Sequence, residues 1–115
     1  MKKWDVILLN VVPFVDLTDA KPRPALILSP NESLDSDQDF LVSYITSNIT
    51  RMSPYDLIID RLHFEFLDTG LHVSSALRIN KINLLSKTLF VRKLGVFGPK
   101  LQEDTNILLR KFLQL

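Results

Sequence analysis

The apolar residues of this chain occur in short segments that are rich in β-branched side chains and are interrupted by proline, serine or asparagine. Segments of this length and composition are typical of strands. They predict strands over residues 4–12, 24–28, 40–46, 56–59, 74–85 and 88–96. Many short strands joined by brief connections predict a mostly β domain that bends into a small barrel.

The connections carry their own signals. Residues 16–22 are polar, and residues 31–39 are polar and acidic, which predicts a loop in the first range and a long surface loop in the second. Pro24 is expected only at the start of its strand, because proline lacks the N–H that an interior ladder position needs. Ser86 and Lys87 predict a tight turn between the last two strands.

After Gly98 the period of the apolar residues changes. Pro99 suits the first turn of a helix. The apolar side chains that follow keep helical spacing, and the stripe consists of Leu101, Thr105, Leu108, Leu109, Phe112 and Leu113. Arg110 and Lys111 complement the helix dipole in the last turn. A helix over residues 99–113 is therefore predicted to close the fold.

Composition narrows the possible functions. With 115 residues, the chain is predicted to form one domain over residues 1–115. The absence of cysteine excludes disulfides, thiolate metal sites and a cysteine nucleophile, and the two histidines, His63 and His72, exclude a His-rich metal site. Three glycines do not supply a Gly-rich phosphate loop. Because no membrane span or signal peptide is visible, we expect a cytoplasmic protein. We also expect no cofactor.

Charge is unevenly distributed along the chain. The net charge is +1, but residues 1–70 hold 6 basic and 11 acidic residues, whereas residues 71–115 hold 8 basic and 2 acidic residues. A near-neutral total can therefore conceal a basic face that attracts nucleic acid. Composition alone is equally compatible with ordinary solvated lysines and arginines.

One combination of residues suggests phosphate chemistry. Arg23 stands between Pro22 and Pro24 where a loop meets a strand, and Thr46 and Ser47 place hydroxyls where another strand ends. A guanidinium beside hydroxyls suits a phosphate or a pentavalent phosphorane. Each piece also has a plain structural interpretation, since arginine is common on surfaces and Thr-Ser is common in turns.

Taken in order, these pieces resemble the PemK/MazF family of toxins from type II toxin–antitoxin modules. The resemblance covers most of the chain and rests on Lys21-Pro22-Arg23-Pro24-Ala25-Leu26, Ile45-Thr46-Ser47, Gly70-Leu71 with Ser74, Ser75 and Arg78, and Lys93-Leu94-Gly95. It implies a small SH3-like barrel of the CcdB/PemK type with a C-terminal helix. It also implies a homodimer and a cognate antitoxin protein as partner.

The resemblance further implies an mRNA interferase, a metal-independent endoribonuclease that cleaves single-stranded RNA. The family's catalytic arginine and threonine match Arg23 and Thr46. Arg23 is then expected to stabilise the phosphorane formed by 2′-hydroxyl attack, and Thr46 to orient the reacting groups. The expected substrate-binding residues are Phe14, Lys21, Ser47, Arg78, Lys81 and Lys87. His63 and His72 are interpreted as structural or surface residues.

Two departures and two alternatives accompany this interpretation. Trp4 precedes Asp5 where the family commonly has glycine, and the loop before Arg23 contains no glycine. The chain can instead be a non-catalytic barrel that binds an antitoxin or nucleic acid, or a structural subunit. Arg23 and Thr46 favour the catalyst over the binder. The basic bias after Gly70 favours both of these over the structural subunit.

Overall fold

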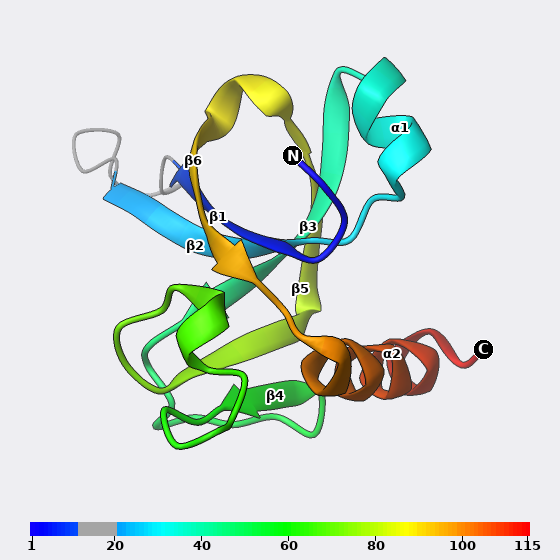
Figure 1. Cartoon of the computed structure of the whole chain (residues 1–115). Coiled ribbons are helices and arrows are strands. Elements are labelled where there is room, and N and C mark those ends of the chain that lie inside the picture. The colour runs from blue at the N-terminus through cyan, green and yellow to red at the C-terminus, as the bar shows by residue number, and fades with distance from the viewer. Residues whose placement is uncertain (12–20) are drawn as a thin grey trace.

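A computed structural model describes residues 1–11 and 21–115, and in these ranges the chain forms one six-stranded antiparallel sheet (Figure 1). The strands are β1 (Asp5–Val11), β2 (Lys21–Ile27), β3 (Asp39–Thr46), β4 (Asp56–Ile59), β5 (Ser75–Ser86) and β6 (Phe90–Val96). The helices are α1 (Asn31–Ser36) and α2 (Pro99–Leu113), with 3₁₀ turns η1 (Leu67–Thr69) and η2 (Lys87–Leu89). The predicted mostly β architecture is confirmed.

The sheet is strongly bent but open. Its strand order is β4-β5-β3-β2-β1-β6, so β4 and β6 are edges that do not pair with each other. The ladder between β3 and β5 is irregular between Ser43 and Ile45, and the ladder between β1 and β6 is irregular at two places. Irregularities of this kind bend and twist strands. They give the curvature of the expected barrel without its closure.

Two hydrophobic clusters cover opposite faces of the central strands. On β1, Val6 belongs to one cluster, and Ile7 and Leu9 belong to the other. Alternating side chains point to opposite faces of a sheet, so a central strand with apolar residues at nearly every position is buried on both sides. The first cluster includes Leu101 of α2, and the second includes Leu34 of α1. Each helix therefore closes one of the two cores.

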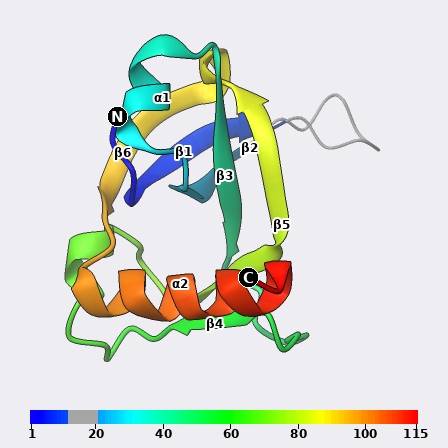
Figure 2. The ribbon, with the colours of Figure 1, turned by 90° about the vertical axis from the view of Figure 1, so that its right-hand side faces the viewer.

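The C-terminal helix has the predicted bounds and lies across the end of the sheet that holds β4 (Figure 2). A distant residue caps it. The buried Glu65 carboxylate accepts hydrogen bonds from the backbone N–H groups of Lys100 at 3.0 Å and Leu101 at 2.8 Å. A carboxylate at this end satisfies free donors and complements the dipole. Glu65 thus connects α2 to the segment between β4 and β5.

The long surface loop predicted over residues 31–39 is wrong for its first part, which forms α1. The N–H groups of Ser33 and Leu34 both donate to the carbonyl of Pro30, and Leu34 is buried. A helix of 6 residues with a single buried side chain has no detectable period. The short strand 39–46 then follows almost as predicted.

Strand β2 begins at Lys21, so Pro24 does not stand at its start as predicted. Strand β1 pairs with residues 21–26, whereas β3 pairs only from Ala25 onward. Pro22 and Pro24 therefore lie where one side of β2 has no neighbouring strand, and there a missing N–H is tolerated. Residues 16–20 of the predicted loop lie outside the described residues.

The connection between β5 and β6 is longer than the predicted tight turn. In place of a two-residue turn, Ser86 leads into η2 and β6 begins at Phe90.

Within residues 1–11 and 21–115, no helix combines the length and apolar character that a membrane crossing requires.

Candidate active site

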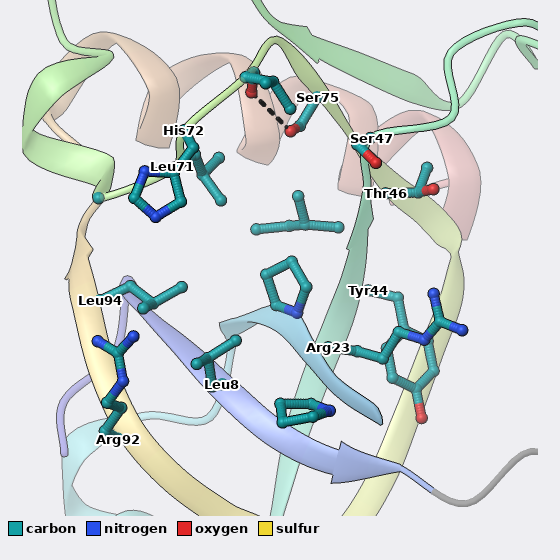
Figure 3. Close-up of a pocket in the computed structure, with 15 residues that line it drawn as sticks. Leu8, Arg23, Tyr44, Thr46, Ser47, Leu71, His72, Ser75, Arg92 and Leu94 are labelled. Atoms are coloured by element: carbon teal, nitrogen blue, oxygen red, sulfur yellow. Dashed lines mark hydrogen bonds between the residues drawn. The ribbon is translucent and has the colours of Figure 1, made fainter. Parts of the chain in front are cut away.

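A pocket of about 640 Å³ opens where the first half of β2 passes the end of β3 (Figure 3). Five parts of the chain line it: β1, β2, the end of β3, the segment that leads into the start of β5, and β6. The lining residues are Leu8, Pro22, Arg23, Pro24, Tyr44, Ile45, Thr46, Ser47, Gly70, Leu71, His72, Val73, Ser75, Arg92 and Leu94.

Arg23, Thr46 and Ser47 all line this pocket. Sheet register explains how they meet. Ala25 pairs with Tyr44, and the β2–β3 ladder ends at this pair, so the residues before Ala25 and those after Tyr44 leave the ladder at the same end. The two sequence pieces that predicted phosphate chemistry therefore line one pocket.

The local bonding of Arg23 and Thr46 leaves both able to bind a ligand. The Thr46 hydroxyl oxygen accepts a hydrogen bond from the N–H of Asn48 at 3.1 Å, so its own proton can be donated elsewhere. Arg23 is exposed, and its guanidinium makes no hydrogen bond or ion pair within the described residues. A cation without an internal partner, next to a hydroxyl donor, suits an anionic group.

On the opposite wall of the pocket, the backbone at Gly70 and the backbone at Gly95 lie close together. Gly70 has a φ of 72°, and a Cβ at this residue would lie 2.1 Å from the carbonyl oxygen of Leu94. A Cβ at Gly95 would lie 2.2 Å from the carbonyl oxygen of Asp68. The Gly70-Leu71 and Lys93-Leu94-Gly95 pieces therefore pack backbone against backbone. This contact sets residues 71–73 beside β6.

Sequence reasoning missed two residues of this wall. His72, interpreted from the sequence as a structural or surface residue, is exposed and lines the pocket, and Arg92 also lines it. Arg92 pairs with Leu8 across the β1–β6 ladder, so both side chains reach the same face. In Figure 3, His72 and Arg92 lie on one side of the pocket, and Arg23, Tyr44 and Thr46 lie on the other. The Gly-Leu sequence before His72 was the only available signal.

Tyr44 contributes a phenolic hydroxyl besides those of Thr46, Ser47 and Ser75. Burial raises the pKa of its phenol above the ordinary value of 10.0, because the charged form is poorly solvated there. The phenol is therefore protonated at neutral pH and able to donate a hydrogen bond. The described lining contains two arginines and no carboxylate, so its charge favours an anion.

Other predicted site residues lie elsewhere. Arg78 contacts the Asp56 carboxylate at 3.3 Å and donates to the carbonyl of Asn48 at 3.2 Å. The ammonium of Lys87 donates to the carbonyl of Leu34. Neither these two nor Lys21 and Lys81 line the pocket. Lys21 directly precedes the lining residue Pro22, and Lys81 is exposed on β5.

Two remaining sequence observations concern Phe14 and Trp4. Phe14 lies outside the described residues. Trp4 has a φ of 77°, a left-handed conformation that glycine adopts without steric cost. A glycine is expected at this position from the family resemblance, and this backbone conformation is one that glycine favours.

The described residues offer no site for a metal of the usual kind. Across residues 1–11 and 21–115, no three or more histidine, aspartate or glutamate side chains gather closely enough to coordinate an ion. The pocket instead combines guanidinium, hydroxyl and imidazole groups.

A bent, open antiparallel sheet with an arginine–threonine pocket defines a small β domain suited to an anionic ligand. The sequence matches the model of one protein family over residues 2–113, and that family is described as the PemK-like, MazF-like toxin of type II toxin–antitoxin systems. The chain therefore belongs to this toxin family. The predicted family is confirmed.

Solved structures show the same fold. An endoribonuclease from a mycobacterial species, in complex with its cognate antitoxin, has a TM-score of 0.77 at 18% identity and covers 100% of this chain and 96% of its own. The toxin MazF-mt6 of Mycobacterium tuberculosis has a TM-score of 0.77 at 15% identity, with 96% and 97% covered.

The MazE–MazF complex of Deinococcus radiodurans also matches, with a TM-score of 0.75 at 16% identity and coverage of 100% of this chain and 96% of the other. No curated protein sequence matches the chain. At these identities the structural likeness shows the fold, and the family model shows the class of toxin.

Proposed function

We propose that this toxin is a metal-independent endoribonuclease that cleaves single-stranded RNA by attack of the 2′-hydroxyl on the adjacent phosphate. The observation that carries the proposal is the convergence of Arg23 and Thr46, from two different strands, on one pocket without a described carboxylate. Solved proteins of the same fold include endoribonucleases, which supports the same activity here.

The chemistry assigns a role to each of the two residues. A phosphorane gathers negative charge, and Arg23 supplies a fixed cation with a planar pair of donors. Thr46, whose oxygen is already occupied by the Asn48 N–H, donates its proton to a phosphate oxygen. Ser47 and Tyr44 offer further donors on the same side. Because magnesium prefers carboxylate oxygens, the described donor set favours catalysis without it.

The RNA backbone needs contacts beyond the reacting phosphate. We propose that Lys21, next to the pocket, and Lys81, on the exposed side of β5, contact neighbouring phosphates. Phe14 remains a proposed base contact. Phosphate contacts dominate nucleic-acid affinity and make it depend on salt, so these residues affect binding more than the rate of the bound complex.

We further propose a cytoplasmic homodimer that a cognate antitoxin neutralises. The mycobacterial and Deinococcus toxins were solved in complex with antitoxins, which supports an antitoxin as partner. Leu62, Phe64 and Leu67 are 86%, 80% and 90% exposed, and apolar side chains gathered outside the core are typical of interaction surfaces. Light scattering at micromolar concentration tests the dimer, and a one-chain mass would contradict it.

The decisive experiment incubates the purified protein with mixed RNA in chelator and maps the ends of the products. Internal 2′-hydroxyl attack gives a 2′,3′-cyclic phosphate and a 5′-hydroxyl. Arg23→Ala serves as the matched control and should abolish cleavage. Loss of activity in chelator, or a 5′-phosphate product, would show that water is the nucleophile.

The second candidate function is a barrel that binds an antitoxin or nucleic acid without cutting. Intact RNA after incubation with a toxin that nevertheless binds it would establish this alternative. Growth arrest on expression that Arg23→Ala does not relieve would point the same way.

A further inference from the structure

The proposed reaction requires a group that removes the proton of the 2′-hydroxyl, and neither Arg23 nor Thr46 is suited to this task. A guanidinium stays protonated at every physiological pH. An alcohol is a very weak base. General base catalysis in proteins is most often performed by histidine or a carboxylate.

The pocket lining contains few groups able to accept a proton. Its arginines are permanently charged, and burial keeps the Tyr44 phenol protonated because it raises the pKa of that group. The hydroxyls of Thr46, Ser47 and Ser75 share the weakness of all alcohols, and no carboxylate belongs to the described lining. Among the described lining residues, His72 carries the one imidazole, and an imidazole is the side chain most often used as a general base in proteins.

The surroundings of His72 leave its ring free to act. The side chain is exposed, and within the described residues its imidazole makes no hydrogen bond or ion pair. The other histidine differs, because the Nδ1 of His63 accepts the N–H of Glu65 at 3.0 Å and its ring stacks on Phe64. His63 does not line the pocket.

The charged groups around His72 come from several elements. Arg92 on β6 shares its side of the pocket, and Arg23 on β2 and the protonated Tyr44 on β3 lie on the opposite side (Figure 3). In sequence, the nearest charged residues are Asp68, which is exposed, and Arg78 on β5, which is paired with Asp56. The backbone N–H of Arg61 donates to the hydroxyl of Ser74, two residues after His72.

We infer that His72 is the general base of this toxin, and this inference rests on the proposed ribonuclease function. The neutral imidazole takes the proton from the 2′-hydroxyl while the 2′-oxygen forms its bond to phosphorus and the bond to the 5′-oxygen breaks. The leaving 5′-oxygen takes a proton from water, and the imidazolium returns its proton to solvent. Arg23 and Arg92, on opposite sides of the pocket, hold the phosphate between them.

The first test compares single-turnover cleavage of a short single-stranded RNA by the wild type and His72→Gln between pH 5 and 9. The wild-type rate should rise with pH and level off through one inflection, as catalysis by a single general base requires. His72→Gln should cleave about 10²–10⁴-fold more slowly and lose that inflection. RNA binding and the melting temperature should stay unchanged. His63→Gln is the matched control and should keep the inflection.

The second test separates a base from an acid. In an RNA whose scissile 5′-oxygen is replaced by sulfur, the leaving group departs without a proton, so loss of an acid is rescued and loss of a base is not. His72→Gln should remain slow on this substrate. Rescue, or an unchanged rate and inflection on ordinary RNA, would overturn the inference while Arg23→Ala still shows that the ribonuclease function holds. An inactive wild type would contradict the ribonuclease function itself.

Discussion

Two regions of the sheet hold arginines in opposite circumstances. On β5, Arg78 is only 23% exposed and bonds to a carboxylate whose side chain is wholly buried, that of Asp56. At the pocket, Arg23 and Arg92 are exposed and have no internal partner within the described residues. All three residues are arginines, and each belongs to a strand.

Arg78 therefore stabilises the fold, whereas Arg23 and Arg92 are available to bind a ligand. Asp56 accepts the N–H of Ser53 at 2.9 Å as well as the Arg78 guanidinium, while its second oxygen has no partner in the described structure. Removing the cation therefore affects the folded state. Removing an arginine at the pocket leaves the fold intact and affects only what binds there.

The largest effect is expected for Arg23→Lys. Lysine keeps the charge but loses the planar pair of donors, so RNA cleavage should fall by about 10²–10³ while the melting temperature stays unchanged. Single-turnover rates and thermal melts check this pair of outcomes. A lysine variant with the wild-type rate would show that charge alone suffices.

The next effect contrasts Arg78→Ala with Arg92→Ala. Arg78→Ala leaves the buried Asp56 without its cation and should lower the free energy of unfolding by about 1–3 kcal/mol. Arg92→Ala should change stability by less than about 0.5 kcal/mol and reduce the salt dependence of RNA binding by about one phosphate contact. Urea titrations and binding at several salt concentrations measure both. Equal destabilisation by the two variants would remove the distinction.

A smaller loss of stability is expected for Glu65→Ala. The carboxylate satisfies two N–H groups at the start of α2, and loss of a helix cap costs about 0.5–2 kcal/mol. The cleavage rate of the folded protein should stay unchanged, because Glu65 lies outside the pocket lining. A slower bound-state rate at full folding would contradict this separation.

The smallest effects distinguish Lys81 from Lys87. Lys81 is exposed, so Lys81→Ala should weaken RNA binding a few-fold and flatten its dependence on salt. Lys87 is bonded to the carbonyl of Leu34, so Lys87→Ala should reduce stability slightly and change binding less. Binding titrations at two salt concentrations, paired with thermal melts, test the contrast. If Lys87→Ala weakened RNA binding more than Lys81→Ala, the bound RNA would instead run along η2.

Most strands and the last helix were predictable because their signals are local. The pattern over residues 99–113 predicts α2 with its observed bounds, and Asp56–Ile59 is likewise a strand as predicted. Short pieces without a period were not predictable. The helix α1 depends on Leu34 reaching the second hydrophobic cluster, and the early start of β2 depends on pairing with β1.

The pocket was predictable only in part. Arg23, Thr46 and Ser47 carry local signals, since prolines flank the arginine and the hydroxyls end a strand. Arg92 carries none, and His72 has only the preceding Gly70-Leu71, because the position of both residues depends on contact between two glycine segments that are far apart in sequence. Arg78 and Lys87 were predicted to bind substrate, but each donates a hydrogen bond to a carbonyl within the protein.

The backbone contact between Gly70 and Gly95 also bears on how relatives of this toxin diverge. Because main-chain atoms hold this wall, an exposed side chain beside it such as Val73 is not needed to keep its shape. Evolution can exchange such a side chain and alter what the pocket binds without rebuilding the scaffold. A single methyl group at either glycine would instead displace the whole wall, so variation is tolerated beside these two residues and not at them.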